Sequence, residues 1–226
     1  MITLPDLFTI VNVLLGFTAI LMATQGNFMG AQILILIAVI TDGVDGILAR
    51  KIEHGTLGPD LDSFADLISF GVAPASVAIM VAYSVSSPYQ VHTINLVSAF
   101  SSAYLVSGML RLSRYNVTSR PERFDGVPIT AGGLCLATFI MIQPFMHLNF
   151  GLICVFFCVL SILMVSRISY PKIKSPKISA PIGILILLIV ALYYLGIEFY
   201  IYIAIVLFVL LILYLFSPLI VKEGSL

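Results

Sequence analysis

Charged side chains are scarce in this sequence of 226 residues. They make up 10% of it, whereas hydrophobic residues make up 60%. A water-soluble core cannot bury so large an apolar fraction, so this scarcity excludes an ordinary soluble domain and indicates a polytopic membrane protein. The eleven basic and eleven acidic residues balance. Net charge therefore predicts no partner, and we expect no binding to nucleic acid.

Cysteine is rare as well. Cys135, Cys154 and Cys158 all lie in apolar runs, and the last two are four residues apart, which is not a CxxC spacing. We interpret them as small membrane-buried residues and predict no disulfide. The N-terminal MITLPD has no basic segment ahead of the first apolar run, so we expect no cleavable signal peptide.

Long apolar runs dominate the rest of the chain. A transmembrane helix needs about 20 apolar residues, and eight segments meet or approach that length. Because the linkers between them are short, the sequence predicts an all-helical bundle with antiparallel neighbours, formed as a single integral-membrane domain over residues 1–226. The predicted spans are residues 6–24, 29–51, 57–84, 91–116, 127–146, 149–166, 178–195 and 198–217.

The basic residues are distributed unevenly between the predicted loops. Loops near 25–28, 85–92, 147–149 and 196–198 contain none. By the positive-inside rule, this asymmetry predicts an even number of spans with both termini on the cytoplasmic side of the cell membrane. The alternate segments hold all eleven basic residues: Arg50, Lys51, Arg111, Arg114, Arg120, Arg123, Arg167, Lys172, Lys174, Lys177 and Lys222.

Acidic residues gather between Asp42 and Asp66. Asp42 and Asp45 are three residues apart, and Asp62 and Asp66 are four apart, so on helices each pair lies on one face. Carboxylates that meet in apolar surroundings repel one another unless a cation lies between them. Oxygen ligands without His or Cys suit Mg²⁺ or Mn²⁺ and argue against zinc. We predict a site for two such ions at the cytoplasmic interface.

Small residues accompany the carboxylates. Gly46 lies four residues after Asp42, and Ala49 lies four after Asp45, so the carboxylate face is nearly bare and a large substrate can approach it. Gly58 supplies a tight turn and Arg50 a fixed positive charge suited to phosphate.

The pattern Asp-x2-Asp-Gly-x2-Ala-Arg-x7-Gly-x3-Asp-x3-Asp, running from Asp42 to Asp66, resembles the signature of the CDP-alcohol phosphotransferase family. The N-terminal Pro5, Thr9, Asn12 and Gly16 match that family as well. The resemblance covers about residues 5–145 and leaves extra helices at about 149–217. It implies a membrane enzyme that transfers a phosphatidyl-type group from a CDP-linked lipid to an alcohol, and it suggests a homodimer.

The resemblance implies roles for particular residues. Asp42, Asp45, Asp62 and Asp66 would hold the ions, and Asp66 would also be the general base. Asn12 would either line the site or bond a neighbouring helix. The CDP-linked lipid would contact Gly46, Ala49, Arg50, Gly58 and Ser63.

The acceptor is indicated by a later stretch. DSFADLISFGVAPA, RLSRYNV and FDGVPI are similar to the phosphatidylserine synthase branch of the family, in which the acceptor is L-serine and the products are a serine phospholipid and CMP. Arg111, Arg114 and Asn116 are the predicted acceptor-binding residues, and either arginine suits a carboxylate.

Two alternatives stay open. Glycerol 3-phosphate or inositol phosphate would also suit a cluster of arginines. A divalent-cation transporter could use the same aspartates, although it gives no reason for Gly46, Ala49 and Gly58.

Overall fold

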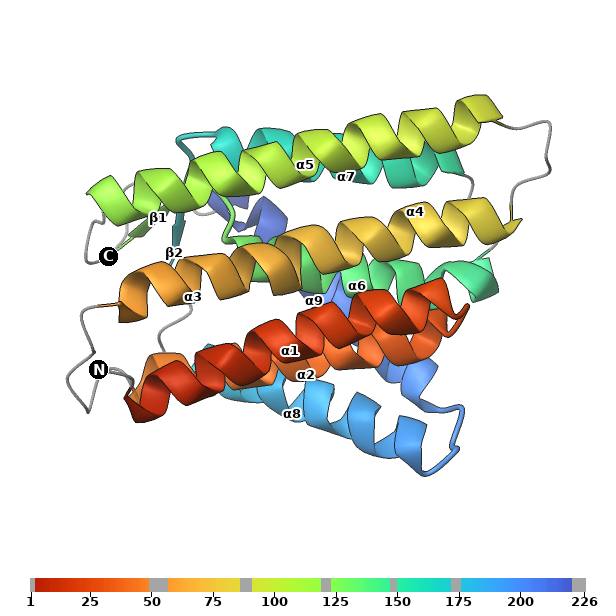
Figure 1. Cartoon of the computed structure of the whole chain (residues 1–226), viewed down its shortest axis with the longest axis horizontal. Coiled ribbons are helices and arrows are strands. Elements are labelled where there is room, and N and C mark those ends of the chain that lie inside the picture. Colours follow the sequence, from red (N-terminus) through yellow and green to blue (C-terminus); the bar gives the residue numbers. More distant parts are fainter. Residues whose placement is uncertain are drawn as a thin grey trace.

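The computed structural model of the chain describes residues 3–48, 57–85, 91–118, 123–146, 150–171 and 176–220. This part of the chain is almost entirely helical (Figure 1). Its helices are α1 (Leu4–Thr24), α2 (Phe28–Leu48), α3 (Gly58–Asp66), the π-helical segment η1 (Leu67–Val72), α4 (Ala73–Val85), α5 (Val91–Thr118), α6 (Ile129–Met146), α7 (Phe150–Val165), α8 (Pro176–Tyr194) and α9 (Tyr200–Ile220). The two short strands are β1 (Arg123–Asp125) and β2 (Ser169–Pro171).

The predicted spans coincide with these helices. Each of the eight predicted ranges matches one helix, except that residues 57–84 match the continuous helical run of α3, η1 and α4. Within the described residues, five helical runs are long and apolar enough to cross a membrane, and three apolar helices, 129–143, 150–165 and 180–194, are shorter. The prediction of an all-α polytopic membrane protein is therefore confirmed.

Local capping explains where α1 begins and ends and where α2 begins. The Asp6 carboxylate accepts hydrogen bonds from the backbone N–H of Thr3 at 2.6 Å and from its hydroxyl at 2.9 Å, which caps α1. Gly26, at φ 79°, ends this helix in the left-handed conformation that glycine adopts without strain. Asn27 then caps α2 by accepting a hydrogen bond from the Gly30 N–H.

The third helical run changes its winding in the middle. Pro74 has no N–H to donate to the Phe70 carbonyl, as an α-helix would require. The Tyr104 hydroxyl of α5 donates to that carbonyl instead, at 2.7 Å. Residues 67–72 form the π-helical segment η1 just before Pro74. The winding therefore changes around Gly71 and Pro74, and the loosened stretch directly follows Asp66.

Glycines let neighbouring helices approach η1 closely. A Cβ added to Gly16 of α1 would lie 2.7 Å from the Ser69 Cα, and one added to Gly133 of α6 would lie 2.8 Å from the Phe70 Cα. Either side chain would force the backbones apart. The Ser69 hydroxyl also donates to the Asn12 carbonyl at 2.8 Å, so α1 and α6 hold η1 from two sides.

The loops that carry basic residues contain structure that the sequence does not predict. β1 pairs antiparallel with β2, with Phe124 opposite Tyr170, and the Gly126 N–H donates to the Ile168 carbonyl. Gly126 has φ 80°, and any side chain there would collide with the Met164 carbonyl. Strands of three residues are too short to show an alternating pattern, so the sequence predicts only loops in these segments.

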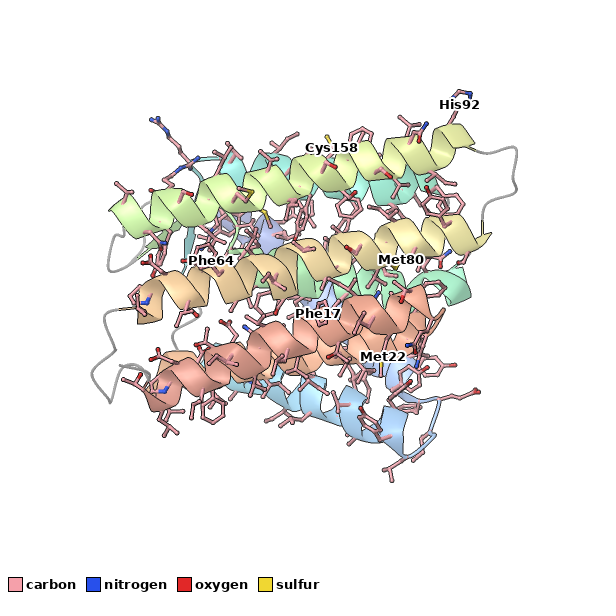
Figure 2. All side chains as sticks on the ribbon, in the orientation of Figure 1. Phe17, Met22, Phe64, Met80, His92 and Cys158 are labelled. Carbon is pink, nitrogen blue, oxygen red and sulfur yellow. The ribbon has the colours of Figure 1, made fainter. Side chains whose placement is uncertain are left out.

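Apolar side chains fill the interior and also cover the outside. One cluster of buried apolar residues extends from Ala19 in α1 to Leu215 in α9. Large apolar side chains such as Phe17, which is 53% exposed, and Phe64, 63% exposed, project outward (Figure 2). An apolar exterior around an apolar core is what a bundle surrounded by lipid requires.

Candidate metal and substrate site

Three of the four predicted metal ligands meet at one end of the bundle. This end is where α2 ends and α3 begins (Figure 1). Asp42 of α2 and Asp62 and Asp66 of α3 each offer a carboxylate oxygen, and these oxygens lie within 4.8 Å of one another. The helical spacings of the two pairs place them on facing helix surfaces, and the packing of α3 and α2 against α1 brings those surfaces together.

The carboxylate cluster has the chemistry of a divalent-cation site. Asp66 is 9% exposed, and its Oδ1 atom is buried with no hydrogen-bond partner among the described residues. A buried carboxylate oxygen without a donor is costly, and three adjacent carboxylates add mutual repulsion. A hard cation between the oxygens removes both costs. The residues present therefore fit Mg²⁺ or Mn²⁺.

Asp45 lies beside this group but is not one of its three members. It is 5% exposed, and its carboxylate accepts a hydrogen bond from the Thr9 hydroxyl of α1 at 3.2 Å. Its charge acts on the same neighbours, Asp42 and Asp62. Its role as a fourth ligand stays a prediction.

Asn12 stands one helical turn from Thr9. Its side chain is completely buried, and neither amide atom has a hydrogen-bond partner among the described residues. Only its backbone carbonyl bonds a neighbouring helix, through Ser69. The sequence left two roles open for the Asn12 side chain, lining the site or bonding a neighbouring helix. In the described structure, the amide makes no hydrogen bond to another helix.

Arg111 lies inside the bundle, next to the carboxylates. It is 5% exposed, and its guanidinium lies over the Tyr115 ring at 5.6 Å from the centroid. Its charge interacts with Asp66 and Asp42. Within the described structure, Arg111 thus places a positive charge beside the carboxylate cluster.

Arg114 occupies different surroundings. Its guanidinium donates to the Val165 carbonyl at 3.1 Å and to the Ser166 carbonyl at 3.4 Å. These carbonyls belong to the last residue of α7 and to the residue that follows it, where a cation stabilises the helix end. The sequence offered both arginines as acceptor ligands, whereas the structure places Arg111 at the carboxylates and Arg114 on the end of α7.

Ser63 and Asn116 were predicted to contact different substrates, but they bond each other. The Asn116 amide donates to the Ser63 hydroxyl at 2.9 Å, and that hydroxyl donates to the Pro59 carbonyl at 3.0 Å. This pair ties α3 to the end of α5. It therefore holds Asp62 and Asp66 in position relative to Arg111.

The structure describes some of the residues that were predicted to contact the CDP-linked lipid. A Cβ at Gly46 would meet nothing within 4 Å, so α2 leaves open space at this position. Gly58 is buried as the first residue of α3, directly ahead of Pro59. Ala49 and Arg50 lie outside the described residues.

Thr130 is a site residue to which the sequence analysis gave no role. It stands in the first turn of α6, and its side chain hydrogen-bonds the Asp42 carboxylate. A lone threonine carries no spacing signal, so only the packing of α6 against α2 could show this contact.

The chain belongs to the CDP-alcohol phosphatidyltransferase family, whose model matches residues 2–216. The matched range extends past residue 145, where the resemblance noted in the sequence ends, and includes most of α9. The predicted family is thus confirmed.

Three named relatives are similar to most of this chain. An archaetidylserine synthase from Methanothermobacter thermautotrophicus is 35% identical over 176 residues, which cover 76% of this chain and 71% of the relative. A CDP-diacylglycerol–serine O-phosphatidyltransferase from Bacillus subtilis is 39% identical over 173 residues, 76% of this chain and 91% of the relative. One from Helicobacter pylori is 33% identical over 197 residues, 83% and 80% respectively.

Proposed function

We propose that the chain transfers the phosphatidyl-type group of a CDP-linked lipid to the hydroxyl of L-serine, giving a serine phospholipid and CMP. The observation that carries this proposal is the buried Arg111 beside the cluster of Asp42, Asp62 and Asp66. An amino-acid acceptor needs a cation for its carboxylate close to the reacting hydroxyl. The names of the relatives, which act on serine or yield a serine lipid, support the same acceptor.

The donor is held through its phosphates. Asp42, Asp62 and Asp66 would hold a divalent cation, and Asp45 would help to hold a second. When bound, such ions neutralise charge on the phosphates of the donor and of departing CMP. The bare face at Gly46 gives the nucleotide room against α2, and we expect Arg50 to pair with a phosphate.

Asp66 is the residue best placed to take a proton from serine. Its Oδ1 has no hydrogen-bond partner among the described residues, so it can accept one from an incoming hydroxyl. The serine oxygen bonds to the lipid phosphorus, the bond from that phosphorus to the bridging oxygen breaks, and CMP leaves with the electron pair. The serine proton passes to Asp66. Arg111 holds the serine carboxylate by a forked contact.

The deciding experiment measures CMP release by purified protein with Mg²⁺ and a CDP-linked lipid, either diacyl or isoprenoid. Separate tubes contain labelled L-serine, glycerol 3-phosphate or inositol phosphate. We expect CMP release and lipid labelling only with serine. Labelling with another alcohol would retain the family chemistry and reject serine. Transport of labelled Mn²⁺ into proteoliposomes without any CMP release would favour the transporter alternative.

The orientation and assembly of the chain belong to the proposal too. We expect the carboxylate end to face the cytoplasm, because the described Arg111 and Arg114, in the last part of α5, and Arg167, just after α7, lie at this end (Figure 1). We expect a homodimer from the family resemblance. Asp60→Cys should react with a membrane-impermeant thiol reagent only in opened cells. His92→Cys, on an exposed residue at the opposite end (Figure 2), should react in intact cells. Mass measurement in lipid nanodiscs tests the dimer.

A further inference from the structure

The last helix carries a buried hydroxyl that the fold does not use. Tyr214 of α9 has its phenol oxygen buried, with no hydrogen-bond partner among the described residues. Buried tyrosine hydroxyls are normally paired, because an unpaired one loses the hydrogen bonds it makes to water. The Tyr214 hydroxyl therefore marks a position where a group outside the protein can supply the missing partner.

The surroundings of this hydroxyl indicate what that group is. The phenol of Tyr214 interacts electrostatically with the Arg111 guanidinium. Arg111 in turn interacts with Asp66 and Asp42. Tyr214 is therefore within electrostatic reach of the same positive charge as the carboxylate cluster, but it belongs to α9.

Independent contacts fix the helix that carries Tyr214. The Tyr170 hydroxyl of β2 donates to the Leu215 carbonyl at 3.0 Å, and the Tyr170 and Tyr214 rings pack with centroids 5.6 Å apart. β2 follows directly after the carbonyls that Arg114 contacts, and Arg114 lies one helical turn from Arg111. The small sheet and the end of α7 thus hold Tyr214 in a defined place relative to Arg111.

We propose that Tyr214 is a substrate-positioning residue whose hydroxyl donates a hydrogen bond to the carboxylate of the amino-acid acceptor held by Arg111. A carboxylate has about four acceptor positions, so it can take the fork of an arginine and a further donor together. The proposal rests on the proposed transfer to serine. It gives α9, which had no role in the sequence analysis, a part in selecting an acceptor that carries a carboxylate.

The test compares Tyr214→Phe with the unchanged protein, measuring initial rates of CMP release against serine and against CDP-diacylglycerol. The substitution removes one oxygen, so the expected result is a rise of about three- to tenfold in the KM for serine. The kcat and the KM for the CDP-lipid should change less than about twofold. Tyr202→Phe, on the exposed side of the same helix, is the matched control and should change none of these constants.

Two further readouts separate positioning from a structural role. Tyr214→Phe should melt at the same temperature as the unchanged protein or higher, because no hydrogen bond of the described fold is lost. Ethanolamine, which lacks the carboxylate, should inhibit serine transfer equally in both proteins. An unchanged KM for serine would overturn the inference, and so would a lower melting temperature or a raised KM for the CDP-lipid alone. If the unchanged protein released no CMP with serine, the proposed function itself would fail.

Discussion

Both ends of the helix bundle bury polar side chains, yet the two ends differ in charge. At one end, Asp42, Asp62 and Asp66 meet beside Arg111. At the other, Gln32 is 1% exposed, and neither of its amide atoms has a hydrogen-bond partner among the described residues. Gln32 lines a cavity of about 310 Å³ together with Phe28, Met29, Val81, Ser84, Ile140, Met141 and Gln143.

The difference between the two ends shows what separates a reactive site from a buried polar group that lacks a partner. A neutral amide buried without a partner costs a few kcal/mol at most, roughly 1–3. A group of buried carboxylates costs far more unless cations bind among them. The charged end thus needs ligands outside the protein, and the neutral end tolerates their absence.

The largest effect is expected for Asp66→Asn. The change keeps the shape of the side chain but removes its negative charge and basicity, so CMP release should fall by about 10²–10⁴-fold. Binding of the CDP-lipid, measured by its protection against thermal unfolding, should still be detectable. Asp60→Asn is the matched control, because Asp60 lies in the first turn of the same helix and is exposed. Retained activity in Asp66→Asn would reject Asp66 as the base.

The next effect concerns the metal. Asp62→Asn removes one of the three clustered carboxylates and should raise the Mg²⁺ concentration for half-maximal activity by about tenfold or more. Mn²⁺ or Mg²⁺ should raise the melting temperature of the unchanged protein after chelator treatment, because a ligand that binds only the folded state stabilises it.

The control for the metal prediction lies at the opposite end of the helix bundle. Glu198 is an exposed acidic residue between α8 and α9, and Glu198→Gln should leave the metal response unchanged. If neither metal changed the melting temperature of the unchanged protein, that result would contradict a cation site at the carboxylate cluster.

A smaller effect should separate the two arginines. Arg111→Lys keeps the charge but loses the planar fork, so the KM for serine should rise about tenfold while the KM for the CDP-lipid changes little. Arg114→Lys loses its paired contacts with the Val165 and Ser166 carbonyls. It should lower the melting temperature and leave the KM for serine within about twofold. The opposite pattern would mean that Arg114 binds the acceptor.

The smallest effect is expected at the neutral end. Gln32→Leu replaces an unpaired buried amide with an apolar group of similar size, so the free energy of unfolding should stay the same or rise by about 1 kcal/mol. CMP release should not change, because the cavity lies at the end of α2 opposite to Asp42. Lost activity at normal stability would show that the two ends are coupled.

Much of the fold could be predicted because the lipid environment makes its rules simple. Apolar length locates helices when every backbone group must be bonded within its own segment. The loosened stretch before Pro74 also has a local cause, since a proline removes a hydrogen bond wherever it stands in a helix. The pairing of β1 with β2 could not be predicted, because it joins segments that are more than 40 residues apart and too short to show a pattern.

The candidate site likewise has features that the sequence predicts and features that only the structure shows. The spacings of Asp42, Asp45, Asp62 and Asp66 place two carboxylates on each helix face, and the scarcity of other charge makes the cluster conspicuous. The sequence by itself therefore determined the family and predicted a cluster of carboxylates with the chemistry of a cation site. Only the tertiary structure decided that Arg111 lies beside the carboxylates, that Arg114 bonds the end of α7, that Ser63 bonds Asn116, and that Tyr214 interacts electrostatically with Arg111. Those contacts join different helices, and spacing along one helix does not say which of its neighbours each face meets.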